Sequence, residues 1–373
     1  MRIVLLLQLI LFCTPFLGTS QENQALTRLN DAAFIALENS DTAVTRLANE
    51  LLDASSKSNK SSVFGINAHT ILGIINKDKG YYITSLNHYL KALNQAEEIH
   101  DEGRVSACFN NIGSVYQLQN NFTKSKIYFE KSLAIEEILD HPLQTSIRLY
   151  NLGEVYAKMD SFTLALSFYN RSLLIEKEQQ NAEGEVYALL GISEVYIRLE
   201  RFPDAGILLN EIETNLAKHQ IEEQILYHKL AGVLFSKKNE LDLANNALRK
   251  AESISVQNDF RIHLLDIYTE QIAVLKAQQK WHAVVLKYDT YTRLNHELNN
   301  LRVKNQLEDL TFQNELNKKE LEVELIQEEK NLVMMNKEMV ETTSQHRQKV
   351  VWFLVTSIFV LFGLIVLGIR KLS

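Results

Sequence analysis

Small and bulky positions recur along the middle of the chain at an interval of about forty residues. Five small residues set the phase, with spacings of 40, 40, 40 and 39 residues: Gly73, Gly113, Gly153, Ser193 and Gly232. Twelve positions after each comes a second small residue: Ser85, Ser125, Ala165, Ala205 and Ala244. Four positions further on stands a bulky residue: Tyr89, Phe129, Tyr169, Leu209 and Leu248. A phase kept over five cycles indicates an internal structural repeat.

Each repeat predicts a pair of α-helices. Leu152, Gly153 and Tyr156 lie at helical spacing on a first helix, and Ala165 lies on a second one. Where small residues face each other, two helices can approach closely, and aromatic side chains fill the seam with the next pair. One pair cannot bury its apolar face alone, whereas a stack of pairs can. The sequence therefore predicts an all-α solenoid of helical hairpins with a period of about 40 residues.

The solenoid is expected to cover residues 21–290. Five clear units are flanked by degenerate ones at 31–52 and 267–288, as is typical of caps whose outer faces meet water. After residue 290 the repeat ends, and no Gly or Pro occurs between 233 and 362. Residues 291–349 are therefore predicted to form a long helical stalk.

Leucines in the stalk favour a coiled coil. Leu294, Leu298 and Leu301 fit the a and d positions of a heptad, which predicts a parallel homodimer through the stalk. Three polar residues interrupt this seam: Asn305, Glu308 and Glu328. The alternative is a solvated helix that only tethers the solenoid.

Both ends of the chain carry apolar stretches. Residues 1–20 contain Arg2, an apolar core and Pro15, a pattern typical of a secretory signal peptide, with an uncleaved anchor as the alternative. Residues 350–369 carry no charge and are long enough to span about 30 Å of hydrocarbon, so they predict one transmembrane helix. Together these segments predict a single-pass membrane protein whose body is periplasmic and whose residues 370–373 form a short cytoplasmic tail.

Composition and charge limit the classes of partner that the protein is expected to bind. With only 13 Gly and 3 Pro, the chain has few helix breakers. Between the two apolar ends, 36 basic residues face 46 acidic ones, so the predicted body carries a formal charge of −10 and is not expected to bind nucleic acid. Cys108 is the only cysteine of that body, so no intramolecular disulfide is expected there and Cys108 should pack as a small hydrophobic residue.

The repeat resembles the tetratricopeptide repeat family. Leu152-Gly153-x-x-Tyr156 and Ala165-x-x-x-Tyr169 match the first and second helices of that family's pattern, although the usual period is about 34 residues. The order of segments resembles the periplasmic sensor regions of bacterial tetratricopeptide-containing membrane histidine kinases and helix-turn-helix regulators. The cytoplasmic effector domain of those proteins has no counterpart in residues 370–373, so no catalytic residue is carried over from them.

Sequence signatures of catalysis are absent. The chain contains no G-x-x-x-x-G-K-[ST], G-x-G-x-x-G, G-x-S-x-G or H-E-x-x-H pattern, so no enzymatic activity and no cofactor are expected. His219 with Glu222 and Glu223 is the nearest approach to a metal cluster, and we interpret these residues as solvated corner residues rather than as metal ligands.

The concave face formed by the first helices is the candidate binding site. In this phase, seven residues are expected to line its groove: Asn110, Asn111, Tyr150, Asn151, Glu154, Tyr187 and Glu194. Carboxamides donate to and accept from a peptide backbone, and tyrosines add contact area with a polar tip. The alternative is that the asparagines only satisfy neighbouring backbone groups.

These features predict a membrane-anchored extracytoplasmic module without catalytic activity. It is expected to bind a protein or peptide in its groove and to act in signalling or envelope assembly. The alternative is the sensory subunit of a split two-component-type signal transducer, or a truncated sensor, whose effector is a separate chain.

Overall fold

The computed structural model describes residues 21–39, 42–56, 62–311, 352–353 and 357. Helices make up this part of the chain, which contains no strand. They are α2 (Gln21–Glu38), α3 (Val44–Ser56), α4 (Ser62–Asp78), α5 (Tyr82–Glu98), α6 (Glu102–Leu118), α7 (Phe122–Leu139), α8 (Pro142–Lys158), α9 (Phe162–Glu178), α10 (Ala182–Arg198), α11 (Phe202–Glu213), the short 3-10 helix η1 (Leu216–Lys218), α12 (Ile221–Lys237), α13 (Leu241–Gln257) and α14 (Arg261–Ala277). A further helix covers residues 281–311. The predicted all-α class is confirmed.

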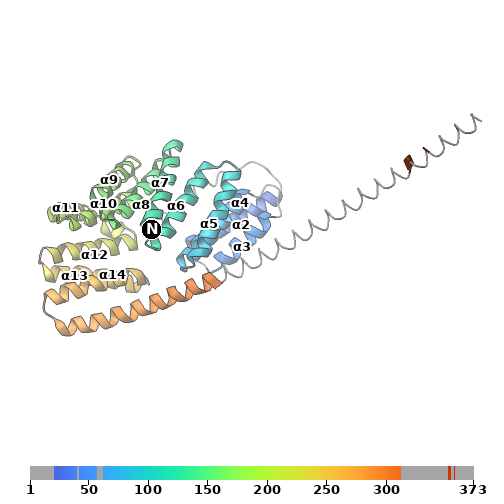
Figure 1. The fold of residues 1–373 in the computed structure, drawn as a ribbon. Helices are drawn as coiled ribbons and strands as arrows, with labels where there is room; N and C mark the ends of the chain where they lie inside the picture. Colours follow the sequence, from blue (N-terminus) through green and yellow to red (C-terminus); the bar gives the residue numbers. More distant parts are fainter. Residues whose placement is uncertain (1–20, 40–41, 57–61, 312–351, 354–356, 358–373) are drawn as a thin grey trace, which may run out of the picture. The chain divides into compact units, whose positions relative to one another are not determined.

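Consecutive helices pack as hairpins, and the hairpins stack on one another (Figure 1). The tightest pairs are α4 with α5, α6 with α7, α8 with α9, and α12 with α13. Each pair also packs on the next, through α5 on α6, α7 on α8 and α9 on α10. The chain divides into two units, Met1–Asp309 and Leu310–Ser373, and the stack belongs to the first. The predicted solenoid of helical hairpins is therefore confirmed.

Left-handed residues at the corners set the repeat length. Non-glycine residues with φ between 54° and 63° occur mostly 20 residues apart: His100, Asn120, Asp140, Asp160, Gln180, Glu200, Asn239, Asp259 and Gln279. The next amide donates back to the carbonyl five positions earlier, as from Asn121 N to Tyr116 O at 2.8 Å. This arrangement satisfies the last carbonyls of a helix. Two 17-residue helices, such as α5 and α6, and two three-residue corners make up the 40-residue period.

The glycines of the repeat allow each first helix to accept a bulky side chain from the second. A Cβ atom on Gly73 would lie 2.4 Å from the Tyr89 ring, and one on Gly113 would lie 2.7 Å from the Phe129 ring. Ser85 Oγ also donates to the carbonyl of Gly73 at 2.7 Å. The close approach of small residues thus holds two helices together while an aromatic ring fills the space above the glycine.

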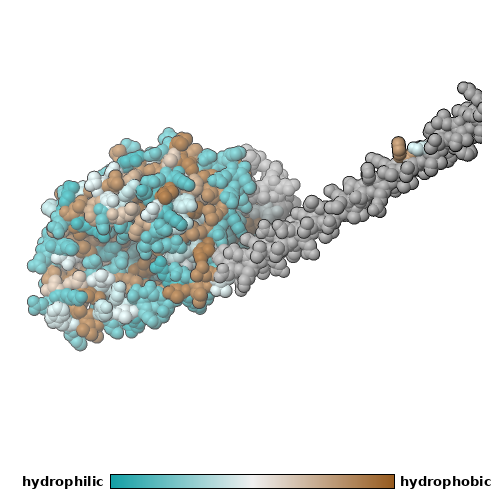
Figure 2. Space-filling view, in the orientation of Figure 1, coloured by the Kyte–Doolittle hydropathy of each residue, from teal (hydrophilic) through white to brown (hydrophobic). Residues whose placement is uncertain are grey.

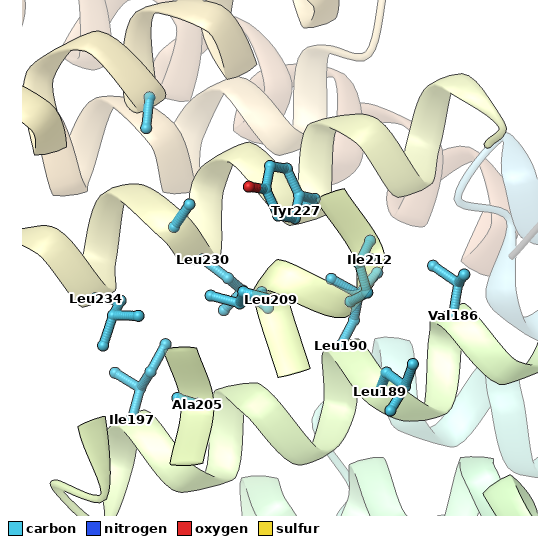
Figure 3. Packing of buried hydrophobic residues seen from close by; sticks show 12 residues of the cluster. Val186, Leu189, Leu190, Ile197, Ala205, Leu209, Ile212, Tyr227, Leu230 and Leu234 are labelled. Atoms are coloured by element: carbon cyan, nitrogen blue, oxygen red, sulfur yellow. The ribbon is translucent and has the colours of Figure 1, made fainter. Parts of the chain in front are cut away.

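Apolar side chains are packed between the helices. Figure 3 shows the largest cluster, in which Leu190 of α10, Leu209 of α11 and Leu230 of α12 meet. Cys108 of α6 lies in another cluster, is 2% exposed, and has its thiol pKa raised to about 12 by burial. On the face drawn in Figure 2, hydrophilic residues cover most of the solenoid and apolar ones are interspersed. The described stack therefore has a series of apolar clusters between its helices and a mixed surface.

The single-pass membrane localisation predicted from the sequence is corrected by the structure. Within the described ranges, no helix combines the length and the apolar character that a bilayer crossing requires. The solenoid helices have at most 18 residues, and the longer helix over 281–311 carries charges throughout, whereas a span needs about 20 mostly apolar residues. The predicted signal peptide (1–20), the stalk beyond 311, the tail (370–373) and most of 350–369 lie outside the described residues.

Two histidines, the buried His69 and the half-buried His88, meet at the interface of α4 and α5. The Nδ1 atoms of His69 and His88 are 3.1 Å apart, and the ring centroids are 5.3 Å apart. Burial lowers the pKa of both rings to about 4, with a smaller contribution from the charge of Lys91 and, for His69, from His88. Because one ring must donate to the other, the pair is stable only while at least one ring is neutral.

We expect this pair to make the solenoid sensitive to acid. Since the folded pKa values lie below the unfolded value of about 6.5, the unfolded chain binds more protons between pH 6.5 and 4, and stability is lost as the pH falls through that window. The loss should reach roughly 3 kcal/mol per histidine at most. Urea unfolding at pH 7 and pH 4.5 should show it in the wild type and much less in the His69→Gln/His88→Gln variant. The exposed His282→Gln variant should behave like the wild type. An equal loss of stability between pH 7 and pH 4.5 in all three proteins would contradict the prediction.

Candidate functional site

The predicted groove residues lie on the first helices of three successive hairpins. Asn110 and Asn111 belong to α6, Tyr150 and its neighbours Asn151 and Glu154 to α8, and the last two, Tyr187 and Glu194, to α10. Because the repeat keeps its phase, equivalent positions of these helices share one face. The α8 and α10 helices pack directly on each other, and a side-chain hydrogen bond links α6 to α8.

Tyrosine rings form the centre of the site. The Tyr150 ring lies 6.1 Å from the Tyr187 ring in an edge-to-face arrangement and 5.4 Å from the Tyr169 ring. Tyr169 belongs to α9 and is held between two glycines, since a Cβ atom on Gly153 or Gly191 would lie 2.6 or 2.7 Å from its ring. This second-helix tyrosine was not predicted as part of the site. In the sequence, Tyr169 stands sixteen positions after Gly153, and the repeat pattern predicted only a packing role for a bulky residue at that position.

Two carboxylates stand beside these rings. Glu154 and Glu194 occupy the same position in consecutive repeats, and both are partly exposed. Burial raises the pKa of Glu154, the charge of Glu194 raises it further, and a 3.4 Å hydrogen bond from Gln117 acts in the opposite direction. Burial, and then the charge of Glu154, also raises the pKa of Tyr150. In the described part of the chain, neither carboxylate forms an ion pair with a basic residue. The two carboxylates therefore make this face electronegative; among the described residues the charge of Lys158 acts on Glu154 only from beyond ion-pair distance.

The predicted asparagines lie in the seam between helices. Asn151 Nδ2 donates to Asn110 Oδ1 at 2.8 Å, and the three asparagines are at most 7% exposed. Asn110 Nδ2 and Asn111 Oδ1 have no hydrogen-bond partner among the described residues. Direct contact between these residues and a ligand stays a prediction; Asn110 is fully buried and accepts its side-chain hydrogen bond from Asn151.

Gln117 is a further polar residue of this face. It lies four positions after Gly113, one turn along α6, and its amide links α6 to Glu154 of α8. Gln117 was not predicted as a site residue, because the equivalent residue of the next repeat is Ala157, so this position is not polar in every repeat.

The histidine and glutamates at the start of α12 have separate partners. His219 Nδ1 lies 3.5 Å from Glu223, whereas Glu222 lies 3.3 Å from His263 Nε2 of α14. No group of three metal-binding side chains occurs in the described residues. Glu223 also closes a capping box with Gln220 at the N-terminus of α12. These contacts give the residues a structural role in holding two hairpins together.

The stacked hairpins and their 40-residue phase define a helical-hairpin repeat protein. Residues 66–137, which contain α5, α6 and most of α4 and α7, match the tetratricopeptide repeat family model. This part of the chain consists of tetratricopeptide repeats, so the resemblance inferred from the glycine and tyrosine spacing is confirmed. No curated protein matches the chain.

Several solved structures have a similar fold. The apo form of RapI superposes with a TM-score of 0.59 at 14% identity and covers 74% of this chain and 99% of its own. NprR in complex with its cognate peptide NprX gives a TM-score of 0.55 at 14% identity, over 78% of this chain and 84% of its own. A Rap protein complexed with Competence and Sporulation Factor gives 0.51 at 12% identity, over 77% and 90%. At these identities the likeness is one of fold.

Proposed function

We propose that the protein is a non-enzymatic interaction module that binds a peptide or protein segment on the first-helix face of α6, α8 and α10. The observation that carries the proposal is the pair of carboxylates, Glu154 and Glu194, beside the Tyr150 and Tyr187 rings without an ion-pair partner in the described residues. Two of the similar structures, those of NprR and a Rap protein, hold a peptide or a named factor, which supports the same use of this fold.

The chemistry of the face favours a basic ligand segment. Carboxylates form charge-assisted hydrogen bonds with ammonium and guanidinium groups, and tyrosine rings attract a cation placed over their faces. Burial, and to a smaller extent the charge of Glu194, raises the pKa of Glu154, and a lysine or arginine side chain of the ligand would offset the repulsion between the two carboxylates. The formal charge of the whole chain, −7, acts in the same direction by attracting basic partners.

Charge-neutralising substitutions test the proposal. We expect Glu154→Gln/Glu194→Gln to weaken the capture of lysine- and arginine-containing peptides from an array by at least about 10-fold, because a charge-assisted hydrogen bond contributes about 1.5–3 kcal/mol. Fluorescence anisotropy with the best peptides gives the affinity. Folding should be unaffected or improved, since each substitution removes an unpaired charge.

The matched control is Glu178→Gln/Glu200→Gln, which removes the same charge from two exposed positions, the end of α9 and the corner after α10. It should retain the affinity, apart from a small general loss that disappears at high salt. Equal binding by both double variants, or an array on which basic peptides are not enriched, would contradict the proposed site.

We further propose that the protein acts in signal transduction. The similar structures include the quorum sensor NprR from B. thuringiensis, with a TM-score of 0.53, and a signal transduction ATPase with a tetratricopeptide repeat sensor, with a TM-score of 0.52. The second candidate is therefore the sensory subunit of a split transducer whose effector is a separate chain. A homodimer through the stalk also stays a proposal, supported by Leu301 of the predicted seam, which is 53% exposed.

A further inference from the structure

The corner between α4 and α5 is contacted by residues from the far end of the solenoid. Asn305 Nδ2 donates to the carbonyl of Lys79, and the Tyr81 hydroxyl donates to Glu308 at 2.9 Å. Asp309 accepts from the amide of Thr84 at 2.9 Å. These partners are more than 220 positions apart in the sequence, whereas the other hairpins contact mainly their neighbours.

Asp309 serves as the missing cap of α5. The N-terminal amides of a helix need acceptors, which a side chain at the N-cap position usually provides. Asp101 does this for α6, accepting from Arg104 N at 3.0 Å. Tyr81, at the N-cap of α5, provides no such bond. Asp309 fills the role instead, by accepting from the amides of residues 83 and 84 and from the Thr84 hydroxyl.

The 281–311 helix presents a polar face to this corner. Asn305 and Asp309, one turn apart, are only 8% and 2% exposed, whereas the apolar Leu301, Val303 and Leu310 are at least 50% exposed. Hydrogen bonds therefore dominate the contact, and little apolar area is buried in it. Each such bond contributes only modestly to stability, because water replaces it when the contact opens.

Gly80 lies beside Asn305 at this contact. Residue 80 has φ +82° and is the glycine of a corner series whose other left-handed residues carry side chains, such as Asn120. A Cβ atom on Gly80 would lie 3.7 Å from Asn305 Nδ2 and 4.0 Å from Asn305 Cβ. These are ordinary van der Waals distances, so a Cβ atom at residue 80 would fit directly against Asn305.

The first part of the same helix is fixed to the end of the stack. Lys287 pairs with Glu252 of α13 at 2.9 Å, and Glu297 pairs with Arg261 of α14 at 2.5 Å. Further along, Arg302 reaches the Leu118 carbonyl of α6 at 3.3 Å. The helix therefore leads from the last hairpin to the α4–α5 corner (orange in Figure 1).

We propose that the 281–311 helix is a strap that latches reversibly onto the α4–α5 corner and so closes the solenoid between its last hairpin and α4–α5. The latch consists of Asn305, Glu308 and Asp309 on the strap, and residues 79–84 on the corner. Fixed at α13 and α14 and held by hydrogen bonds at its other end, the strap opens at the latch first. That the opening also changes access to the peptide face rests on the proposed function.

Amide hydrogen exchange of the full-length chain tests the latch. With Asp309→Ala, we expect the amides of Ile83 and Thr84 to exchange at least 10-fold faster, because they lose their acceptor. The amide of Arg104, capped by its own Asp101, should keep its rate and shows that the fold is intact. The control Asp289→Ala removes an exposed aspartate from the same helix. Unchanged exchange at residues 83 and 84 would overturn the proposal.

A disulfide trap gives a second, independent measurement. In Gly80→Cys/Asn305→Cys, the expected Cβ–Cβ distance of 4.0 Å suits a disulfide, so oxidation should close the link and slow exchange at Ile83 and Thr84 at least 10-fold, reversibly with dithiothreitol. The Asn120→Cys/Asn305→Cys control, at the equivalent corner one repeat on, should not close. Failure of the first pair to close would also overturn the latch. Since neither measurement needs a peptide, a negative result would contradict the strap proposal without testing the proposed binding face.

Discussion

Replacing Arg148 with methionine will lower the free energy of unfolding by about 3–5 kcal/mol. Arg148 is 1% exposed, donates from Nε to Ser132 Oγ at 2.7 Å, and pairs with Glu136 at 3.3 Å. Burial lowers the pKa of Arg148 to about 10, with the charge of Glu136 acting against this shift. Ser106 Oγ and His141 Nδ1 also contact the Glu136 carboxylate, at 2.6 and 3.0 Å. Without the guanidinium, the buried Glu136 carboxylate loses its arginine partner, and breaking a buried pair from one side is the costly change.

The chain offers a matched exposed pair as the control. Arg171 and Glu137 are 2.7 Å apart with side chains 52% and 45% exposed, so Arg171→Met should cost less than about 1 kcal/mol. Chemical denaturation of both variants gives the two values. Arg148→Met/Glu136→Gln should recover part of the loss, because it removes the unpaired charge as well. Equal losses for the two single arginine variants would show that the buried network contributes nothing specific.

Gly153→Val will destabilise the solenoid by about 2–4 kcal/mol and disturb the tyrosine cluster. Its Cβ would lie 2.6 Å from two atoms of the Tyr169 ring. Gly191 of the next repeat faces the same ring, since a Cβ atom built on it would also lie only 2.7 Å from the Tyr169 ring, so the ring has little space on that side. Tyr150 packs on the same ring, so the binding of basic peptides should weaken together with the stability. Thermal unfolding and peptide anisotropy measure the two effects.

Two controls separate overpacking from helix propensity. Gly206→Ala in α11 meets only Leu234 Cδ2 at 3.9 Å, so the substitution should stabilise the protein by up to about 1 kcal/mol. Gly153→Ser/Tyr169→Leu reproduces the residues that the next repeat carries at Ser193 and Leu209, and it should recover much of the stability but not the peptide binding. A Gly153→Val protein as stable as the wild type would show that the ring has room to shift.

The fold was predictable because its determinants are local and repeated. Small and bulky residues return at a fixed interval, so the pattern can be recognised from five repeats even though each single repeat is imperfect. The corners were less predictable, because their left-handed positions are occupied by residues as different as His100, Asn120 and Glu200. The structural requirement there is on the backbone, and asparagine, aspartate and even longer residues meet it at a modest cost that the hydrogen bonds of the corner offset.

For the candidate site, the sequence predicted only which helix face carries it. Phase placed Tyr150, Glu154 and Glu194 together, but it did not show that Asn110 is enclosed by α8 or that Tyr169 reaches the cluster from a second helix. No periodic signal predicted that the 281–311 helix contacts the α4–α5 corner. Asn305 and Glu308 looked like interruptions of a heptad seam, whereas they are the residues that contact the α4–α5 corner.

The remote cap of α5 affects the order in which the protein is made. A chain synthesised from its N-terminus folds its early hairpins first, since each needs only its neighbours. The first amides of α5 nevertheless lack their carboxylate until Asp309, 226 positions after Ile83, has left the ribosome. On a nascent chain, the beginning of α5 therefore stays frayed while the later hairpins assemble, and the arrival of the last helix completes a turn that was translated long before.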